Sequence, residues 1–361
     1  MKTELELNEL ILNLRKNIRE KKPELLKFLD EMPVTIPYEE NPPKHLKTLA
    51  SFYESLVALV EEHKNDPAKS ASENSLNIPL TEIVIMEQEN LYQNLMTEVN
   101  NTTISYKDVG KGDVPIVFLH GFPFDKSMWK GQIDRLKDSN RVIAIDLRGF
   151  GKSTDEKSPL SMDLFGDDLI AFLDKLNIEK AIICGLSMGG YIALNVIQRF
   201  PERFTALVLC DTQCIADSAE VREKRNETIE QINQEGADAF KEKFVTSVFH
   251  PDSLVYKTEL VDSLRNIVFA NSNEIISAGL MALAERSETC STLEKIRVPT
   301  LIICGRQDEV TPLAQSELMH ERIRGSILKV IDNAGHVSNL EQPDEFNKHL
   351  AEFVNSLNTS L

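Results

Sequence analysis

An apolar run that ends in a glycine-flanked serine constrains this chain more than any other feature. Residues 181–184 read as a buried strand, and the sequence Gly-Leu-Ser-Met-Gly-Gly follows at 185–190, just before a helical pattern. A side chain on so tight a strand-to-helix turn is forced into a strained backbone conformation, and only glycine-sized neighbours leave room for it. The pattern predicts that Ser187 is a nucleophile. The alternative is a serine that only caps the helix N-terminus.

A second apolar run, at 115–119, ends in His-Gly-Phe-Pro at 120–123. Backbone N–H groups of such a loop, together with the N–H that follows the nucleophile, stabilise negative charge on a carbonyl oxygen. We predict the N–H groups of Phe122 and Met188 as these oxyanion-hole donors, because Pro123 has no N–H. The bulky Phe122 side chain also indicates a narrow acyl site.

Two later apolar runs lead into an acid, Asp308, and a histidine, His336. The carboxyl ends of parallel strands meet at one edge of a sheet, so we expect these side chains to come together with Ser187. His336 would take the proton from Ser187, and the acid would hold the imidazole in the required tautomer. Asp211 also follows an apolar run and is the alternative acid.

The C-terminal part of the chain alternates between strand-like and helical patterns, which predicts an α/β fold with a mostly parallel sheet flanked by helices. From about 212 to 291 this alternation gives way to charged helical sequence, for instance at 219–234 and 237–248. The predicted helices of the alternating part lie at 161–176 and 187–200. Strands are predicted near 103–107, 114–119, 141–145, 180–184, 205–210, 299–304 and 327–331.

These motifs resemble those of the α/β-hydrolase fold superfamily, from about residue 102 to the C-terminus. The sequences at 146–153 and 335–343 are similar to those of members that act on small molecules, such as oxoadipate enol-lactonases and related esterases. The motifs that carry the resemblance are His-Gly-Phe-Pro at 120–123, Asp-Leu-Arg-Gly-Phe-Gly-Lys-Ser at 146–153, Gly-Leu-Ser-Met-Gly-Gly at 185–190, Gly-Arg-Gln-Asp at 305–308 and Ala-Gly-His at 334–336.

The resemblance implies an α/β-hydrolase core at 101–211 and 292–361, with a helical cap at 212–291. It also implies a serine hydrolase that cleaves a small carboxylic ester, thioester or lactone through an acyl-enzyme, with no cofactor. It favours Asp308 over Asp211, since Asp308 lies just before a Thr-Pro helix start. The haloalkane dehalogenases and epoxide hydrolases of this superfamily have an aspartate as the nucleophile, whereas this chain has Ser187 at that position.

Other functions on the same fold remain open. The alternatives are a carbon–carbon bond hydrolase, an acyltransferase, or a non-catalytic protein that binds a ligand in the capped pocket. Within the predicted cap, Phe240, Phe244 and Met281 are expected to line a substrate pocket together with Phe122. The alternative for these cap residues is that they form the core of the cap itself.

The N-terminal hundred residues have a different pattern. Helical spacing predicts a helical extension at 1–65, and 66–100 reads as a polar linker followed by an uncertain segment. The apolar stripe at 46–60 needs a partner surface. It could pack within the extension, dock on the hydrolase, or mediate self-association or binding of a protein partner.

Composition excludes several classes of function. The 361 residues carry a net charge of −17, which opposes binding to nucleic acid and to anionic membranes. No apolar stretch is long enough for a membrane span, and the first residues lack a signal-peptide layout, so we expect a cytoplasmic protein. Cys184, Cys210 and Cys304 end apolar runs and are expected to be buried reduced thiols. No Cys/His spacing resembles a zinc site, so no metal is expected.

Overall fold

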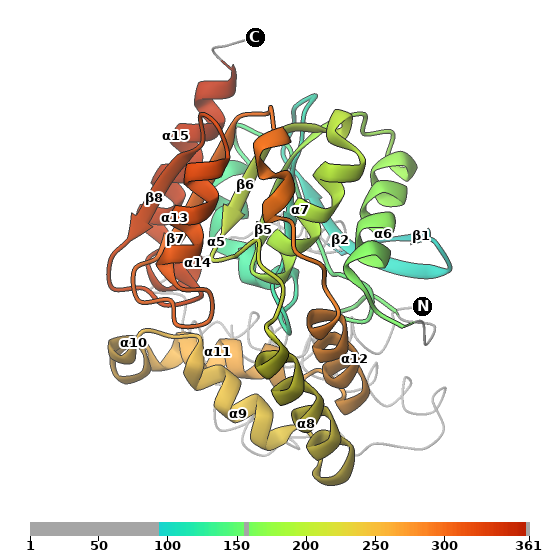
Figure 1. The fold of residues 1–361 in the computed structure, drawn as a ribbon. Coiled ribbons are helices and arrows are strands. Elements are labelled where there is room, and N and C mark those ends of the chain that lie inside the picture. The colour runs from blue at the N-terminus through green and yellow to red at the C-terminus, as the bar shows by residue number, and fades with distance from the viewer. Residues whose placement is uncertain (1–93, 155–158, 359–361) are drawn as a thin grey trace, which may run out of the picture. The chain divides into compact units, whose positions relative to one another are not determined.

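The computed structural model describes residues 94–154 and 159–358 (Figure 1). The chain divides into two units, Met1–Glu82 and Ile83–Leu361, and the described residues belong to the second. The predicted helical extension at 1–65 and most of the predicted segment at 66–100 lie outside the described residues.

One mixed sheet of eight strands forms the centre of the fold, in the order β1-β2-β4-β3-β5-β6-β7-β8. The β1–β2 and β2–β4 pairs are antiparallel, and every other pair is parallel. All seven predicted strands are present. The strands are β1 (Leu95–Val99), β2 (Thr102–Val109), β3 (Ile116–Leu119), β4 (Val142–Ile145), β5 (Ala181–Leu186), β6 (Phe204–Cys210), β7 (Thr300–Gly305) and β8 (Ile327–Ile331).

The central strands β3, β4, β5 and β7 are buried along their whole length, which explains why they read as continuous apolar runs rather than alternating ones. The register pairs Leu119 with Gly185 and Leu186 with Cys210. The carboxyl ends of β3, β5 and β6 therefore lie side by side, so the segments that follow them meet at one edge.

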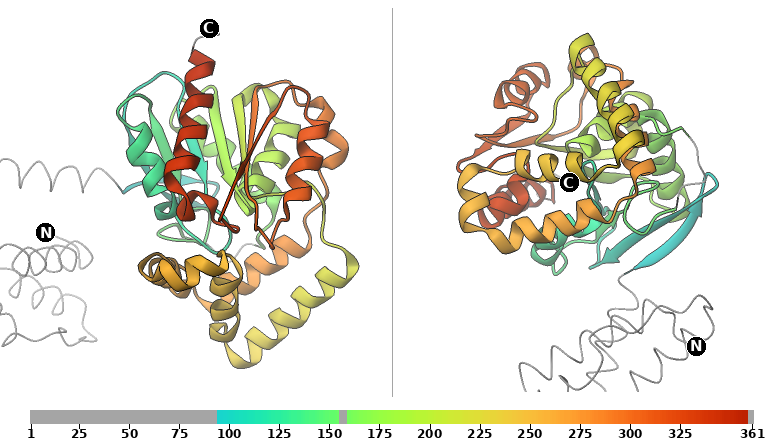
Figure 2. Two further views of the ribbon diagram at one scale, coloured as in Figure 1. Left: turned by 90° about the vertical axis from the view of Figure 1, so that its left-hand side faces the viewer. Right: turned by 90° about the horizontal axis from the view of Figure 1, so that it is seen from below.

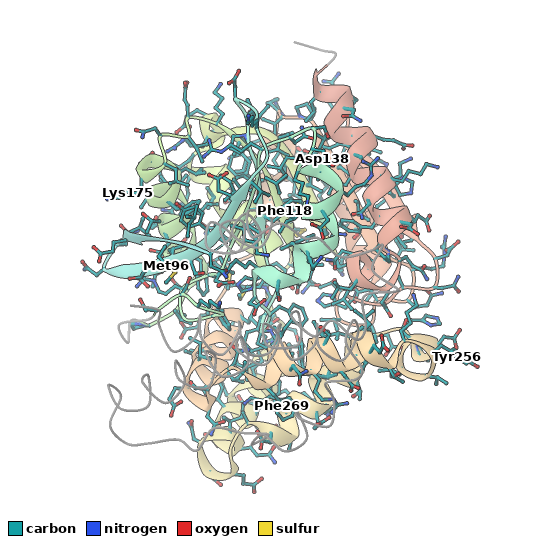
Figure 3. The ribbon with its side chains drawn as sticks, turned by 180° about the vertical axis from the view of Figure 1, so that it is seen from behind. Met96, Phe118, Asp138, Lys175, Tyr256 and Phe269 are labelled. Atoms are coloured by element: carbon teal, nitrogen blue, oxygen red, sulfur yellow. A yellow bond between two sulfur atoms is a disulfide. The ribbon has the colours of Figure 1, made fainter. Side chains whose placement is uncertain are left out.

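Helices cover both faces of the sheet (Figures 1 and 2). Apolar side chains of α6, α7 and α13 share one hydrophobic core with the sheet, and those of α5 and α15 share the other. Phe118 illustrates the second core: it lies in the interior (Figure 3), with its ring centroid 4.7 Å from that of Trp129. These helices are α5 (Lys130–Leu136), α6 (Met162–Lys175), α7 (Met188–Arg199), α13 (Leu313–Arg322) and α15 (Pro343–Asn358).

The helical segment between β6 and β7, residues 212–291, lies at one end of the sheet, and we call it the cap (Figures 1 and 2). The predicted helices at 219–234 and 237–248 correspond to its first two helices. Tyr256 projects from it (Figure 3), with 81% of its surface exposed. The cap helices are α8 (Ala219–Glu235), α9 (Asp238–Ser247), α10 (Pro251–Tyr256), α11 (Thr258–Phe269) and α12 (Asn273–Ala284).

A disulfide between Cys214 and Cys290 joins the two ends of the cap. The sequence predicted no partner for either cysteine. Cys184, Cys210 and Cys304 are free and buried, as predicted.

No single helix among those described is long and apolar enough to cross a membrane. The pair α11 and α12 meets the length and composition criteria only when both helices are taken together, and they are bent by 94° relative to one another.

Candidate active site

Ser187 occupies the tight turn between β5 and α7. Its backbone has φ 52° and ψ −114°, a strained conformation for a residue with a side chain. Glycine neighbours permit this turn, because a Cβ on Gly185 would lie 2.2 Å from the carbonyl oxygen of Gly189. The strain therefore holds the Ser187 hydroxyl at the carboxyl edge of the sheet.

The structure brings Ser187, His336 and Asp308 together, as the sequence predicts. The Ser187 hydroxyl donates to Nε2 of His336 at 2.8 Å, and Nδ1 of His336 donates to Oδ2 of Asp308 at 2.8 Å. This direction of donation requires the neutral imidazole with its proton on Nδ1. All three residues are buried, with exposed fractions of 7%, 1% and 4% respectively. Such a chain of hydrogen bonds can move a proton away from the serine hydroxyl.

Asp308 is held by the turn that follows it. Its Oδ1 accepts from the N–H groups of Val310 at 2.8 Å and Thr311 at 2.9 Å, and its Oδ2 accepts from the Thr311 hydroxyl at 2.7 Å. The Thr-Pro helix start that the sequence analysis noted thus supplies two of the donors that fix the carboxylate. Thr311 was not singled out as a site residue from the sequence.

Asp211, the alternative acid, is also buried but has other partners. Its Oδ1 accepts from the Gly305 N–H at 2.7 Å, and its Oδ2 lies 2.5 Å from the Ser338 hydroxyl. It makes no hydrogen bond to His336. The geometry therefore favours Asp308 as the partner of the imidazole, and Asp211 instead joins the end of β6 to the segment that follows His336.

The surroundings shift the pKa values of the two aspartates in opposite directions. Burial alone would raise the pKa of Asp308, but the charge and hydrogen bond of His336 and the Thr311 bonds bring it below its ordinary value. Burial, with the nearby charge of Asp308, raises the pKa of Asp211 well above its ordinary value. Burial alone would lower the pKa of His336, yet the charge of Asp308 and its hydrogen bond raise it. The surroundings therefore favour the ionised form of Asp308 and disfavour the ionised form of Asp211.

The loop at 120–123 lies against the turn that carries Ser187. A Cβ on Gly121 would be 3.0 Å from a Leu186 methyl group. Within residues 94–154 and 159–358, neither the Phe122 nor the Met188 N–H donates a hydrogen bond to a protein atom. His120 holds the backbone here: its Nδ1 donates to the Gly121 carbonyl at 2.8 Å, and its Nε2 accepts from the Leu147 N–H at 2.9 Å.

Three of the four residues predicted to line a substrate pocket form an aromatic cluster. The Phe122 ring centroid lies 6.3 Å from that of Phe240 and 6.1 Å from that of Phe244, both on α9. Gly279 on α12 makes room for Phe122, since a Cβ there would lie 2.5 Å from the ring. Met281 is exposed, at 39%, and the structure does not place it in this cluster.

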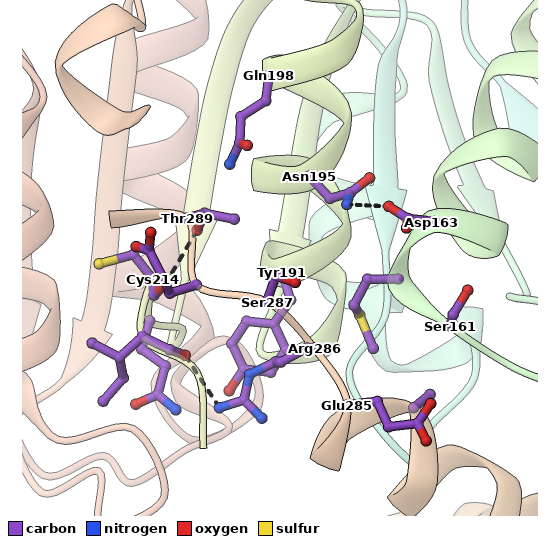
Figure 4. A pocket seen from close by; sticks show the side chains of 15 residues that line it. Ser161, Asp163, Tyr191, Asn195, Gln198, Cys214, Glu285, Arg286, Ser287 and Thr289 are labelled. Carbon is purple, nitrogen blue, oxygen red and sulfur yellow. Dashed lines mark hydrogen bonds between the residues drawn. The ribbon is translucent and has the colours of Figure 1, made fainter. Parts of the chain in front are cut away.

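A separate pocket of about 270 Å³ lies at the base of the cap (Figure 4). Tyr191 and Asn195 of α7 form one wall, and Arg286, which follows α12, forms another. The Arg286 guanidinium stacks on Tyr191 at 4.6 Å and pairs with Asp217 at 2.7 Å. None of Ser187, Asp308 and His336 lines this pocket, so it is distinct from the cluster around the serine.

One position that matters to this site was not assigned a role from the sequence. Glu341 contacts the loop that carries His336 from the segment after it, and its only sequence signal was its place in the motif at 335–343. From the cap, the Val248 carbonyl oxygen accepts the His336 N–H. Among residues 94–154 and 159–358, no group of three or more His, Cys, Asp or Glu side chains is placed to hold a metal ion.

Comparisons with known proteins agree with this fold. Residues 114–343 match the family model described as the alpha/beta hydrolase fold. The chain is 33% identical to 3-oxoadipate enol-lactonase 2 of Acinetobacter baylyi over 255 residues, which is 70% of this chain and 93% of that protein.

Two solved structures are similar in fold. A thermophilic esterase from Thermogutta terrifontis has a TM-score of 0.70 and 31% identity, over 73% of this chain and 99% of that one. The enol-lactonase from Burkholderia xenovorans LB400 has a TM-score of 0.68 and 27% identity, over 72% of this chain and 100% of that one.

Proposed function

Because the chain belongs to the α/β-hydrolase fold family, we propose that it cleaves small carboxylic esters or lactones through an acyl-enzyme on Ser187. The observation that carries this proposal is the buried hydrogen-bonded chain from Ser187 through His336 to Asp308, at 2.8 Å in each step. A serine hydroxyl is a weak nucleophile by itself, and an adjacent imidazole with an acid behind it activates such a group.

In the first half of the reaction, Ser187 Oγ attacks the carbonyl carbon while its proton passes to Nε2 of His336. Asp308, ionised because its pKa is low, stabilises the imidazolium that forms. His336 then gives the proton to the leaving oxygen, and the ester or lactone C–O bond breaks. In a lactone the leaving alcohol stays attached to the acyl group.

The tetrahedral intermediate carries negative charge on the former carbonyl oxygen. The N–H groups of Phe122 and Met188 are the proposed donors to this oxygen, supported by their lack of other acceptors in the described part of the chain. The Met188 N–H also lies at the N-terminus of α7, whose dipole favours negative charge.

In the second half, water replaces the leaving group. His336 takes a proton from this water, the resulting hydroxide attacks the acyl carbon, and the proton returns to Ser187 as the acid is released. Burial of the triad supports this mechanism, because it strengthens each electrostatic interaction. No cofactor takes part in these steps.

The substrate class follows from the relatives and from the aromatic cluster. One relative is named a 3-oxoadipate enol-lactonase and one structural neighbour an esterase, so we propose ester or lactone substrates, with a thioester also within reach of this chemistry. Phe122, Phe240 and Phe244 support a small, apolar acyl site. A panel of esters of increasing acyl length tests this point, and equal turnover across the panel would contradict a narrow site.

The experiment that tests the mechanism is labelling with a fluorophosphonate probe, with the adduct located by mass spectrometry. We expect rapid labelling at Ser187 that is absent in Ser187→Ala and at least about a hundredfold slower in His336→Ala. No labelling of the intact protein would overturn the proposal and favour a ligand-binding protein. Labelling without turnover of any ester or lactone would favour an acyltransferase or a carbon–carbon bond hydrolase.

The cytoplasmic location and a protein partner for the N-terminal helices also remain proposals. The Cys214–Cys290 disulfide supplies a test of location, because cytosolic reductants keep most thiols reduced. Alkylation of the denatured native protein should find five reactive thiols if it resides in a reducing compartment. Three reactive thiols would contradict a cytoplasmic location.

A further inference from the structure

The loop that carries His336 lies directly against the cap. We call residues 334–337 the base loop. The His336 N–H donates to the Val248 carbonyl oxygen at 2.8 Å. A Cβ on Gly335 would lie 2.9 Å from backbone atoms of Val248, Phe249 and His250. Because only glycine allows so close an approach, the base loop and the cap segment at 248–250 pack as one unit.

Glu341 connects the two sides of this contact. Its carboxylate is fully buried; Oε1 accepts from the Gly335 N–H at 2.5 Å and Oε2 accepts from the His250 N–H at 2.7 Å. The Lys257 ammonium, also from the cap, donates to the Glu341 carbonyl oxygen. One carboxylate thus holds both Gly335, just before His336, and His250, just before α10.

If the side chain at position 341 only filled space, a buried carboxylate would be energetically unfavourable there. Burying a charge is unfavourable unless it is hydrogen-bonded, and an apolar side chain of the same volume is often equally stable or more so. A carboxylate, however, offers an acceptor oxygen to each of two N–H donors, whereas a carboxamide offers only one. The presence of two backbone donors on two different segments matches a carboxylate and no other side chain of this length.

We propose that Glu341 is a positioning residue for the general base: it fixes the base loop to the cap, so that His336 Nε2 stays within hydrogen-bonding distance of Ser187. This inference rests on the proposed function. It means that the cap helps to build the catalytic geometry, in addition to covering the site. From the core side, the Ser338 hydroxyl and Asp211, 2.5 Å apart, hold the same loop.

Glu341 also acts on His336 through its charge. Burial alone would lower the pKa of His336; Asp308 raises it most, and Asp211 and Glu341 contribute in the same direction. The titratable and charged groups that face this region are Asp308 after β7, Asp211 after β6, Glu341 itself, and His250, Asp252 and Lys257 from the cap. Of these, only Glu341 touches both the base loop and the cap.

The test compares Glu341→Gln with Glu341→Asp in the full-length chain. The glutamine keeps the shape but places an amide nitrogen against one N–H donor and removes the charge. The aspartate keeps the charge but is too short to reach both donors. Glu345→Gln is the matched control, because the Glu345 side chain is 48% exposed on α15 and lies outside the site. Kinetics on an ester that the wild-type protein cleaves are measured against pH, with thermal unfolding of each variant.

We expect kcat to fall at least about tenfold in both Glu341 variants, with KM changed less than about threefold, because a small misplacement of the base slows the chemical step. In the wild type, kcat/KM should fall on the acid side around a pKa above the ordinary histidine value of 6.5, because protonated His336 cannot accept a proton. Glu341→Gln should move this fall to lower pH, since it removes a negative charge that raises the pKa. Glu341→Asp should leave it in place.

Several outcomes would overturn the inference. One is a lower unfolding temperature with kcat and the pH profile unchanged, which would make Glu341 purely structural. Another is an equal effect in Glu345→Gln. If Glu341→Gln does not fold, Glu341→Asp decides by its kcat alone. Failure of the wild-type protein to label at Ser187 would instead reject the proposed function, so the two failures are distinguishable.

Discussion

Two buried aspartates near His336 differ in the partners that hold them, and this difference predicts unequal effects of removing their charge. Asp308 accepts the Nδ1 proton of His336, whereas Asp211 binds the Gly305 N–H and the Ser338 hydroxyl. Burial, with the nearby charge of Asp308, raises the pKa of Asp211 well above its ordinary value, which favours the neutral carboxyl group. An asparagine is close in shape to a neutral aspartic acid and tolerates the φ of 43° found at this residue.

We therefore expect Asp308→Asn to lower kcat/KM by roughly 10³- to 10⁴-fold, because the wrong imidazole tautomer is then favoured. Asp211→Asn should lower it by less than about tenfold, since the amide oxygen can accept from Gly305 and the amide nitrogen can donate to Ser338. Initial rates on one ester, with the rate of probe labelling at Ser187, measure both effects. Equal losses in the two variants would mean that both acids serve His336.

At the scale of secondary-structure elements, α12 can contact the loop at 120–123 because Gly279 has no side chain. A Cβ on Gly279 would lie 2.5 Å and 2.7 Å from two Phe122 ring atoms, and 3.3 Å from Phe150. The Phe122 ring cannot move far, because Phe240 and Phe244 surround it. A larger residue at 279 must therefore displace the loop that carries the proposed oxyanion donor.

Gly279→Ala should lower kcat/KM about tenfold or more, because the Phe122 N–H moves from its position. It should also lower the free energy of unfolding by about 1–3 kcal/mol through overpacking. Gly131→Ala on α5 is the control, since no atom lies within 4 Å of the added methyl group, and it should be neutral or slightly stabilising. Chemical denaturation and ester kinetics measure both. Full activity in Gly279→Ala would show that the added methyl group displaces the cap instead of the loop at 120–123.

Most strands and several helices of the fold could be predicted from the sequence. The seven strands from β2 to β8 were predicted from short apolar runs, and the helices α6 and α7 from helical periodicity, and both signals are strong and local. The strand β1 was missed: it is a short edge strand, and its burial alternates, with Met96 half exposed. Ser187 and His336 were predicted because glycine-rich turns mark the ends of their strands.

Other features of the site depend on contacts that no local pattern encodes. Glu341 lies within a motif that was noted, but its role depends on His250, which is 91 residues away. Met281 was grouped with Phe240 and Phe244 as an apolar residue of the predicted cap, yet apolar character alone does not say which face α12 buries. Strand order alone left Asp308 and Asp211 as alternatives, since both follow strands at the same edge. The family resemblance favoured Asp308, and the hydrogen bond to His336 agrees with that choice.

On the scale of the whole described unit, the Cys214–Cys290 bond closes a loop that contains nearly all of the cap. The two cysteines are 76 residues apart, and loop-closure entropy for that separation gives a stabilisation of roughly 4.5 kcal/mol as an upper value. The bond sits at the base of the cap, whereas Glu341 and the Phe122 cluster hold the cap at the active site. The disulfide therefore contributes to stability, whereas the proposed catalytic geometry depends on the contacts of Glu341 and Phe122.

This separation predicts that losing the disulfide costs stability more than activity. The double variant Cys214→Ser/Cys290→Ser should lose about 2–4 kcal/mol of unfolding free energy, because the unfolded chain regains the freedom of the open loop. Its rate of Ser187 labelling should stay within about threefold of wild type at a temperature where both proteins are folded. Denaturation with and without reductant provides the control: reductant should destabilise the wild type and leave the double variant unchanged. A labelling rate that falls in parallel with stability would mean that the disulfide, rather than the contacts at Glu341 and Phe122, holds the cap in its working position.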